Sequence, residues 1–131
     1  MPGFPPLILV MLGGAIGAGF RYHVGGIALR NLGPDFPFGT LMVNIVGGFL
    51  MGVLAGTLAR PPLMGPNSEP LRLFLGVGVL GGFTTFSAFS LETVNMINRG
   101  EPVTAASYAL ASVVGSVLAL FAGLLMVRAL A

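Results

Sequence analysis

The stretch Gly81-Gly82-Phe83-Thr84-Thr85-Phe86-Ser87-Ala88-Phe89-Ser90 lies inside a long apolar segment and determines the architecture of the chain. A plain membrane anchor would not contain its paired glycines, hydroxyl groups and phenylalanines. In hydrocarbon, every backbone N–H and C=O group needs a partner, so a helix break persists only where protein buries it or where it lines a polar cavity. We therefore expect a broken helix here and place the functional site beside it.

The composition of the whole chain indicates an integral membrane protein. Hydrophobic residues make up 55% of its 131 residues, and charged residues make up only 8%, against about 25% in an ordinary soluble domain. The mean hydropathy is +0.96. Because one helical crossing needs about 20 residues, the chain accommodates four crossings and no soluble catalytic domain. We expect residues 1–131 to form a single membrane domain.

Turn-forming residues divide the apolar sequence into four predicted transmembrane helices. Proline, glycine and asparagine gather in residues 31–37, 60–70 and 98–102, where the chain is expected to turn. The predicted spans are residues 7–29, 38–58, 71–97 and 103–127, and the third contains the predicted break near Gly81–Thr85. Short loops between the spans favour a compact, all-α unit of four helices.

The charged residues are few and almost evenly distributed between the two ends of the predicted helices. All six basic residues are arginine, and the net charge is +2. Such thinly spread charge excludes a nucleic-acid-binding surface. Arg60, Arg72 and Arg128 fall on the N-terminal side, while Arg30 and Arg99 fall on the other side, with Arg21 near that end. The positive-inside rule hardly discriminates the two orientations, so the chain could insert both ways and form antiparallel dimers, unless a weak bias or a partner fixes one orientation.

Small residues spaced four apart predict close contacts between helices. These glycine pairs are Gly13/Gly17, Gly48/Gly52, Gly52/Gly56 and Gly78/Gly82. The sequence does not say whether the contacts lie within or between subunits. Because four short helices enclose little space, we expect an ion pathway to form on dimerisation. Cysteine is absent, which excludes disulfides and thiolate chemistry.

Polar residues inside the spans are candidates for a pathway, and each also has a structural explanation. Thr40 and Asn44 share one face of the second helix and could instead bond between helices. Tyr108 and Ser116 belong to a ladder of hydroxyl groups with Ser112, although serines also bond to their own helix. Glu92 is either an interfacial charge or part of an ion path.

Arg21 and His23 lie near one end of the first span. A central arginine costs roughly 2.5 to 3.5 kcal/mol on insertion scales, so Arg21 should face protein or water, or extend towards the interface. His23 is interpreted as an interfacial residue. Phe86 and Phe89, three residues apart, are ordinary packing residues or a wall whose electropositive ring edges face an anion.

The chain resembles the Fluc (CrcB) family of small fluoride channels over nearly its whole length. Three motifs agree in order and spacing: Gly13-Gly14-Ala15-Ile16-Gly17 followed by Arg21-Tyr22, then Gly39-Thr40-Leu41-Met42-Val43-Asn44, then the stretch from Gly81 to Ser90. Ala88 stands where threonine is common, and Leu120 stands where some members carry a hydroxyl. The resemblance implies an antiparallel homodimer with two pores that exports fluoride passively across the inner membrane of a bacterium.

The resemblance also implies roles for individual residues. The implied fluoride-pore residues are Asn44, Phe86, Phe89, Thr40, Thr85, Ser87, Glu92, Tyr108 and Ser116. Arg21 would give an aqueous vestibule its attraction for anions. The main-chain oxygens of Gly81 and Thr84 from both subunits would bind a structural Na⁺ at the dimer centre, since a hard cation prefers oxygen ligands.

Two other classes of membrane protein compete with the channel interpretation. A small multidrug exporter would have similar size, but its working carboxylate should lie in the first helix, where this chain has Arg21. An assembly subunit of a larger complex would explain the glycine pairs but not the ordered polar faces. An enzyme is not expected, because no paired nucleophile and base are evident.

Overall fold

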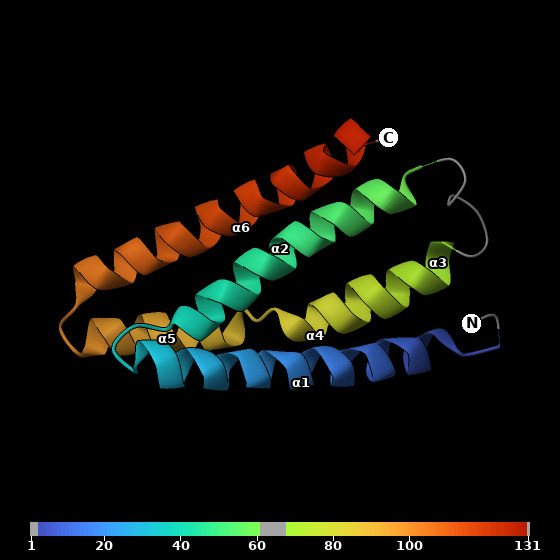
Figure 1. Ribbon diagram of the computed structural model, residues 1–131. Coiled ribbons are helices and arrows are strands. Elements are labelled where there is room, and N and C mark those ends of the chain that lie inside the picture. The colour runs from blue at the N-terminus through green and yellow to red at the C-terminus, as the bar shows by residue number, and fades with distance from the viewer. Residues whose placement is uncertain (1–2, 61–67, 131) are drawn as a thin grey trace.

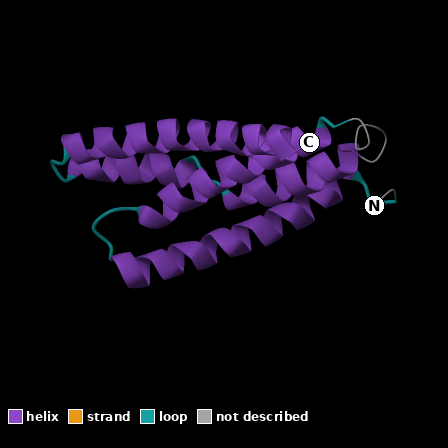
Figure 2. Cartoon of the chain, turned by 45° about the horizontal axis from the view of Figure 1, so that its top comes forward, coloured by secondary structure: helices purple, strands orange, loops and turns teal. Residues whose placement is uncertain are grey.

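A computed structural model describes residues 3–60 and 68–130, and these residues form helices joined by short connections (Figures 1 and 2). In chain order the elements are α1 (Pro6–Leu32), α2 (Phe38–Leu58), α3 (Ser68–Leu71), the π-helical segment η2 (Arg72–Leu80), α4 (Gly81–Phe83), α5 (Ser87–Asn98) and α6 (Pro102–Leu130). In Figure 1, α2 runs between α6 above and α1 below. Both termini lie at the same end of the bundle, as four crossings require.

Four helices are long and apolar enough to cross a membrane, which confirms the prediction of an all-helical protein with four spans. They are Pro6–Leu32, Phe38–Leu58, Ser68–Asn98 and Pro102–Leu130. The first helix runs three residues beyond its predicted end and stops at Gly33, whose φ of 82° suits glycine and whose N–H donates to the Leu29 carbonyl at 3.0 Å. Most of the predicted turn between the second and third spans, residues 61–67, lies outside the described residues.

The third span is interrupted, but not at its glycine pair. Gly81 and Gly82 remain helical in α4, and the chain becomes extended at Thr84, with φ −85° and ψ 161°. Helix α5 starts again at Ser87. The break therefore covers residues 84–86, at the C-terminal end of the predicted region, while Gly82 packs against α1.

Glycines bring α1 against η2 and α4. A Cβ atom built at Gly17 would overlap the carbonyl oxygen of Val79, and one built at Gly13 would overlap that of Phe74. From the other side, a Cβ at Gly82 would lie 2.5 Å from the carbonyl oxygen of Gly14. Real side chains do not approach backbone this closely, so only glycine permits this contact.

The contact between α2 and α6 follows the same rule. A Cβ at Gly48 would lie 2.7 Å from the carbonyl oxygen of Ser116, and Cβ atoms at Gly52 and Gly123 would overlap backbone of the opposite helix. Gly56 packs against Val127. The glycine pairs found in the sequence thus make contacts within one subunit, which the sequence left open.

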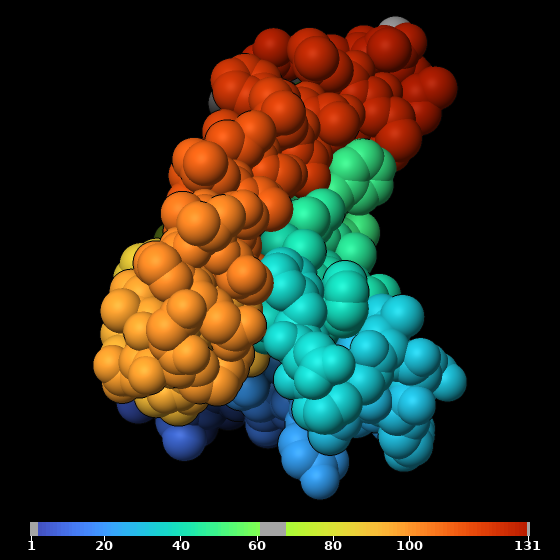
Figure 3. Space-filling view, turned by 90° about the vertical axis from the view of Figure 1, so that its left-hand side faces the viewer, coloured from blue at the N-terminus to red at the C-terminus, as the bar shows by residue number. Residues whose placement is uncertain are grey.

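The most deeply buried side chains gather at the end of the bundle where α1 joins α2 and α5 joins α6. Tyr108 is fully buried, together with Met96 and Ala105, and Phe36 and Phe89 pack against them. Figure 3 views the molecule from this end, where the orange turn between α5 and α6 lies beside the cyan start of α2, with the rest of α6 above them. This cluster holds α5 against α6 beyond the break.

We predict that Gly17→Ala destabilises the protein, whereas Gly19→Ala does not. The added methyl at position 17 would meet the Val79 backbone, while a Cβ at Gly19 meets nothing within 4 Å. Overpacking of this kind costs about 1–3 kcal/mol. Thermal unfolding in detergent should show a lower Tm for Gly17→Ala alone. Equal Tm values for the two variants would contradict the proposed α1 contact.

Candidate functional site

The break in the third span is held by the side chain of Asn44. Its Nδ2 donates to the carbonyl oxygen of Thr85 at 3.0 Å, and the N–H of Thr85 donates to its Oδ1 at 2.8 Å. The amide therefore pairs with the Thr85 backbone in both directions, as a neighbouring backbone would. Because an amide nitrogen carries two N–H groups, one donor of Asn44 remains for another partner.

The break leaves main-chain carbonyls without their helical donors, and those of Gly81 and Thr84 are among them. In a continuous helix, the Thr85 N–H would bond to Gly81, but here it bonds to Asn44. The N–H of Ala88 would bond to Thr84, but it donates instead to Oγ1 of Thr85 at 3.2 Å. The carbonyl oxygens of Gly81 and Thr84 are the two atoms that the resemblance assigned to a cation.

The hydroxyl groups around the break also act locally. Oγ1 of Thr84 donates to the Leu80 carbonyl at 3.0 Å, and Oγ1 of Thr85 lies 3.3 Å from Oγ of Ser87. Thr85 thus caps the start of α5 from one residue before the helical N-cap position. These hydrogen bonds fix the direction in which α5 leaves the break.

Arg21 contacts the break from α1. Its Nε donates to the carbonyl oxygen of Gly82 at 3.1 Å. Arginine has five N–H donors, so this bond leaves most of the guanidinium available. Of the surroundings expected for Arg21, which were protein, water or the membrane interface, this hydrogen bond gives contact with protein.

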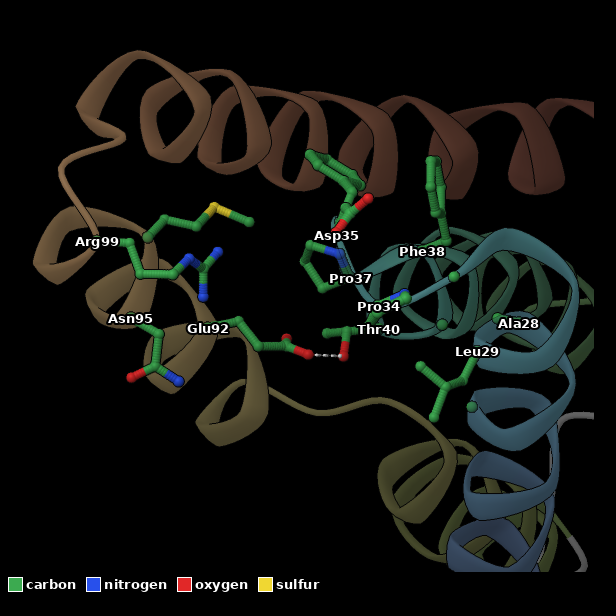
Figure 4. A pocket seen from close by; sticks show the side chains of 15 residues that line it. Ala28, Leu29, Pro34, Asp35, Pro37, Phe38, Thr40, Glu92, Asn95 and Arg99 are labelled. Atoms are coloured by element: carbon green, nitrogen blue, oxygen red, sulfur yellow. Dashed lines mark hydrogen bonds between the residues drawn. The ribbon is translucent and has the colours of Figure 1, made fainter.

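Glu92 joins three helices through two hydroxyl groups. Oγ1 of Thr40 on α2 donates to one carboxylate oxygen at 3.0 Å, and the hydroxyl of Tyr108 on α6 donates to the other at 2.9 Å. Figure 4 shows the Thr40 bond at the edge of a cavity of about 270 Å³. Asn95 and Arg99 line the same cavity from α5. A carboxylate within the membrane is thus supplied with neutral donors.

The phenylalanine pair borders an open groove of about 520 Å³. The rings of Phe86 and Phe89 lie 5.5 Å apart, and Phe89 continues to Tyr108 at 5.2 Å. Phe86 is 76% exposed in the single subunit. Across the groove, Ser112 and Ser116 present buried hydroxyl oxygens that have no hydrogen-bond partner within the described chain. The phenylalanine pair and these two serines therefore line one groove.

A third space, a cavity of about 450 Å³, lies beside Thr85. Arg21 and Thr40 line it, and Thr85 lines both this cavity and the phenylalanine groove. Thr40 in turn lines both this cavity and the one beside Glu92. Thr40 and Thr85 are thus among the residues that neighbouring cavities share across the subunit.

The structure brings together most of the residues selected from the sequence, but some contacts were not foreseen. The exchange of hydrogen bonds between Asn44 and the Thr85 backbone was missed because it joins residues 41 apart. Phe36, whose ring lies 5.4 Å from that of Tyr108 at an edge-on 84°, was treated only as a turn residue. An aromatic side chain in an otherwise polar turn is the feature of the sequence that could have identified Phe36 as a packing residue. Within residues 3–60 and 68–130, no group of three His, Cys, Asp or Glu side chains could hold a metal ion.

We predict that Asn44→Ala destabilises the protein much more than Asn98→Ala, a matched change at the exposed end of α5. Loss of the Asn44 amide leaves the N–H and C=O of Thr85 unpaired, and each orphaned group costs about 1–3 kcal/mol. Thermal unfolding in detergent should show a clear fall in Tm for Asn44→Ala only. Equal Tm values for both variants would show that the amide does not support the break.

Comparison with known proteins gives one consistent result. Residues 8–124 match the family described as CrcB-like protein, Camphor Resistance (CrcB). The chain is 53% identical over 124 residues to a protein of Sphingopyxis alaskensis named "Fluoride-specific ion channel FluC", with 95% of this chain and 96% of the relative covered. Proteins of the same name from Novosphingobium aromaticivorans (55% over 124 residues, covering 93% and 95%) and Phenylobacterium zucineum (57% over 122 residues, covering 93% and 94%) are equally similar. The match covers all four helices and the break, and the chain belongs to the CrcB family.

Proposed function

We propose that this protein is a channel that lets fluoride leave a bacterial cell passively through the cytoplasmic membrane. The observation that carries the proposal is that relatives at least half identical over nearly the full length are named fluoride-specific ion channels. Those relatives are channels rather than enzymes, exporters or assembly subunits, so the competing classes lose their support. The four apolar helices are consistent in length and composition with a multi-pass membrane protein.

The fluoride path runs through the groove beside Phe86 and Phe89. A small, strongly hydrated anion gives up water only where donors replace it. Phe86, Phe89, Ser112, Ser116 and Asn44 line the groove. On this proposal their ring edges, hydroxyls and remaining amide N–H take the place of water around the ion. These groups are neutral, so the anion is bound weakly at several points and can move on.

The path continues beyond Phe89 along the hydroxyl-bearing residues of α2 and α6. Thr40 and Tyr108 point their hydroxyls at Glu92, which keeps that carboxylate paired. Thr85 and Ser87 lie at the break, within reach of the phenylalanine groove. No covalent step is required, because the electrochemical gradient alone drives the ion.

A second copy of this chain completes the pore. Phe86 is mostly exposed in one subunit and stands beside buried, unpaired hydroxyls, an arrangement that a partner surface would close. The arginines are nearly balanced between the two ends, so nothing in the charge pattern opposes an inverted partner. An antiparallel homodimer would form two equivalent grooves and hence two pores.

The break also suits a structural Na⁺ between two such subunits. The carbonyl oxygens of Gly81 and Thr84 have lost the donors that a helix would provide. Two breaks meeting at a two-fold axis would present four such oxygens, and a hard cation prefers oxygen ligands. The ion would offset the cost of burying carbonyls without partners. It would hold the subunits together and take no part in conduction.

We expect purified protein in liposomes, with Na⁺ present, to release fluoride rapidly and chloride hardly at all. Phe86→Ile should lower fluoride efflux about tenfold, equivalent to about 1.4 kcal/mol, because an aliphatic side chain lacks the electropositive edge. A fluoride electrode measures the release.

Phe20→Ile is the matched control for this measurement. Phe20 is 59% exposed on α1 and lines none of the cavities described above, so its replacement should leave efflux unchanged. No fluoride release from folded protein would refute the channel. Normal fluoride release from Phe86→Ile would refute the proposal that the phenylalanine rings line the path, but not the channel itself.

The inverted arrangement predicts half-and-half labelling of single cysteines at opposite ends of the molecule. The chain has no cysteine, so Ala59→Cys and Asn98→Cys each introduce one exposed thiol. In sealed vesicles, an impermeant thiol reagent should label about half of each variant, and the rest only after permeabilisation. Complete labelling of one variant and none of the other would establish a single orientation.

A further inference from the structure

The cavity beside Glu92 has an acidic lining, although the proposed path for an anion leads to it. Asp35, from the turn between α1 and α2, lines this cavity together with Glu92 and Arg99 of α5 (Figure 4). The side chains of Thr40 and Tyr108, which belong to the proposed path, both donate to Glu92. Asp35 and Arg99 are exposed, so this cavity is where the path would meet the solution.

The turn that carries Asp35 is fixed to the buried cluster by the next residue. The ring of Phe36 lies 5.4 Å from that of Tyr108, edge-on, and the Phe36 carbonyl accepts a hydrogen bond from the N–H of Phe38 at 2.8 Å. The Tyr108 hydroxyl in turn donates to Glu92. Asp35 is therefore held beside this cavity by its neighbour along the chain, at a constant place relative to Glu92.

The charges around this cavity do not cancel. Across the two described ranges of the chain, the Asp35 carboxylate makes neither an ion pair nor a hydrogen bond. Glu92 accepts its hydrogen bonds from neutral hydroxyls. Among the described lining residues only Arg99 is basic, and its Nε already pairs with Glu101 at 2.8 Å. An anion at this mouth would therefore meet negative charge without a free cation to offset it.

We propose that Asp35 is an electrostatic barrier that limits how fast fluoride enters the channel through the cavity beside Glu92. The inference rests on the proposed channel and adds a residue that sets its rate without binding the ion. A fixed negative charge at the mouth of a cavity lowers the local concentration of anions there, and with it the rate of entry. Removal of this charge should therefore increase the fluoride current.

The test is fluoride current through single channels in planar bilayers, with sodium fluoride and the same neutral pH on both sides. Asp35→Asn removes the charge with little change of shape, and asparagine suits a turn as well as aspartate does. At low ionic strength, the current of Asp35→Asn should exceed that of the wild type by about 1.5- to threefold. The ratio should approach one at an ionic strength of about 1 M, where the screening length is only about 3 Å.

Two further substitutions of Asp35 separate charge from shape. Asp35→Glu keeps the charge and should keep the wild-type current, whereas Asp35→Lys reverses the charge and should raise the current above that of Asp35→Asn. Glu69→Gln is the matched control, because it removes an exposed carboxylate that lines none of the cavities described above. Its current should match that of the wild type at both ionic strengths.

The failure of this inference and the failure of the channel give different results. No fluoride current in the wild type would refute the channel itself. A normal wild-type current that neither Asp35→Asn nor Asp35→Lys increases at low ionic strength would refute only the barrier. An increase that persists at about 1 M ionic strength, or that Asp35→Glu also produces, would overturn the inference too, because it would come from a change of the turn and not from charge.

Discussion

The hydrogen bond that the Thr85 N–H donates to the Asn44 side chain distinguishes this protein from a bundle of four continuous helices. In hydrocarbon an unpaired amide is costly, so the third helix can break only if that donor finds another acceptor. Asn44 supplies the acceptor and returns a donor to the Thr85 carbonyl. The exchange pairs both backbone groups of Thr85, and it leaves the Gly81 carbonyl without its helical donor, at the surface where we propose a second subunit.

The glycine contacts place the helices close enough for this exchange. Because α1 lies directly on the backbone of η2 and α4, the Arg21 side chain reaches the Gly82 carbonyl at the end of α4. Because α2 and α6 approach just as closely, Tyr108 and Thr40 reach the same carboxylate of Glu92. Side chains of ordinary size at these positions would separate the helices and leave a charge without its donors.

Hydropathy and turn residues were sufficient to predict four helices, since both reflect local composition. The location of the break was predicted less exactly, because Gly81 and Gly82 were taken as the point of weakness. In the structure, Gly82 contacts α1 while the chain opens at Thr84. Asn44 was identified by its helical spacing, but its partner depends on how α2 packs against the third span. No periodicity in the sequence records such a contact, and the same limit applies to the partner of Arg21.

The same hydrogen bonds keep the charged groups of Glu92 and Arg21 away from the proposed fluoride path. A buried arginine or carboxylate facing the ion would trap it or repel it, whereas conduction requires several weak sites. Here the Glu92 carboxylate accepts from two hydroxyls, and Arg21 donates to the Gly82 carbonyl and does not line the groove. The phenylalanine groove is left with only neutral donors along its wall. The residues that make the break tolerable in the membrane therefore also keep fixed charge out of the groove, so one set of contacts supports both the fold and the proposed conduction.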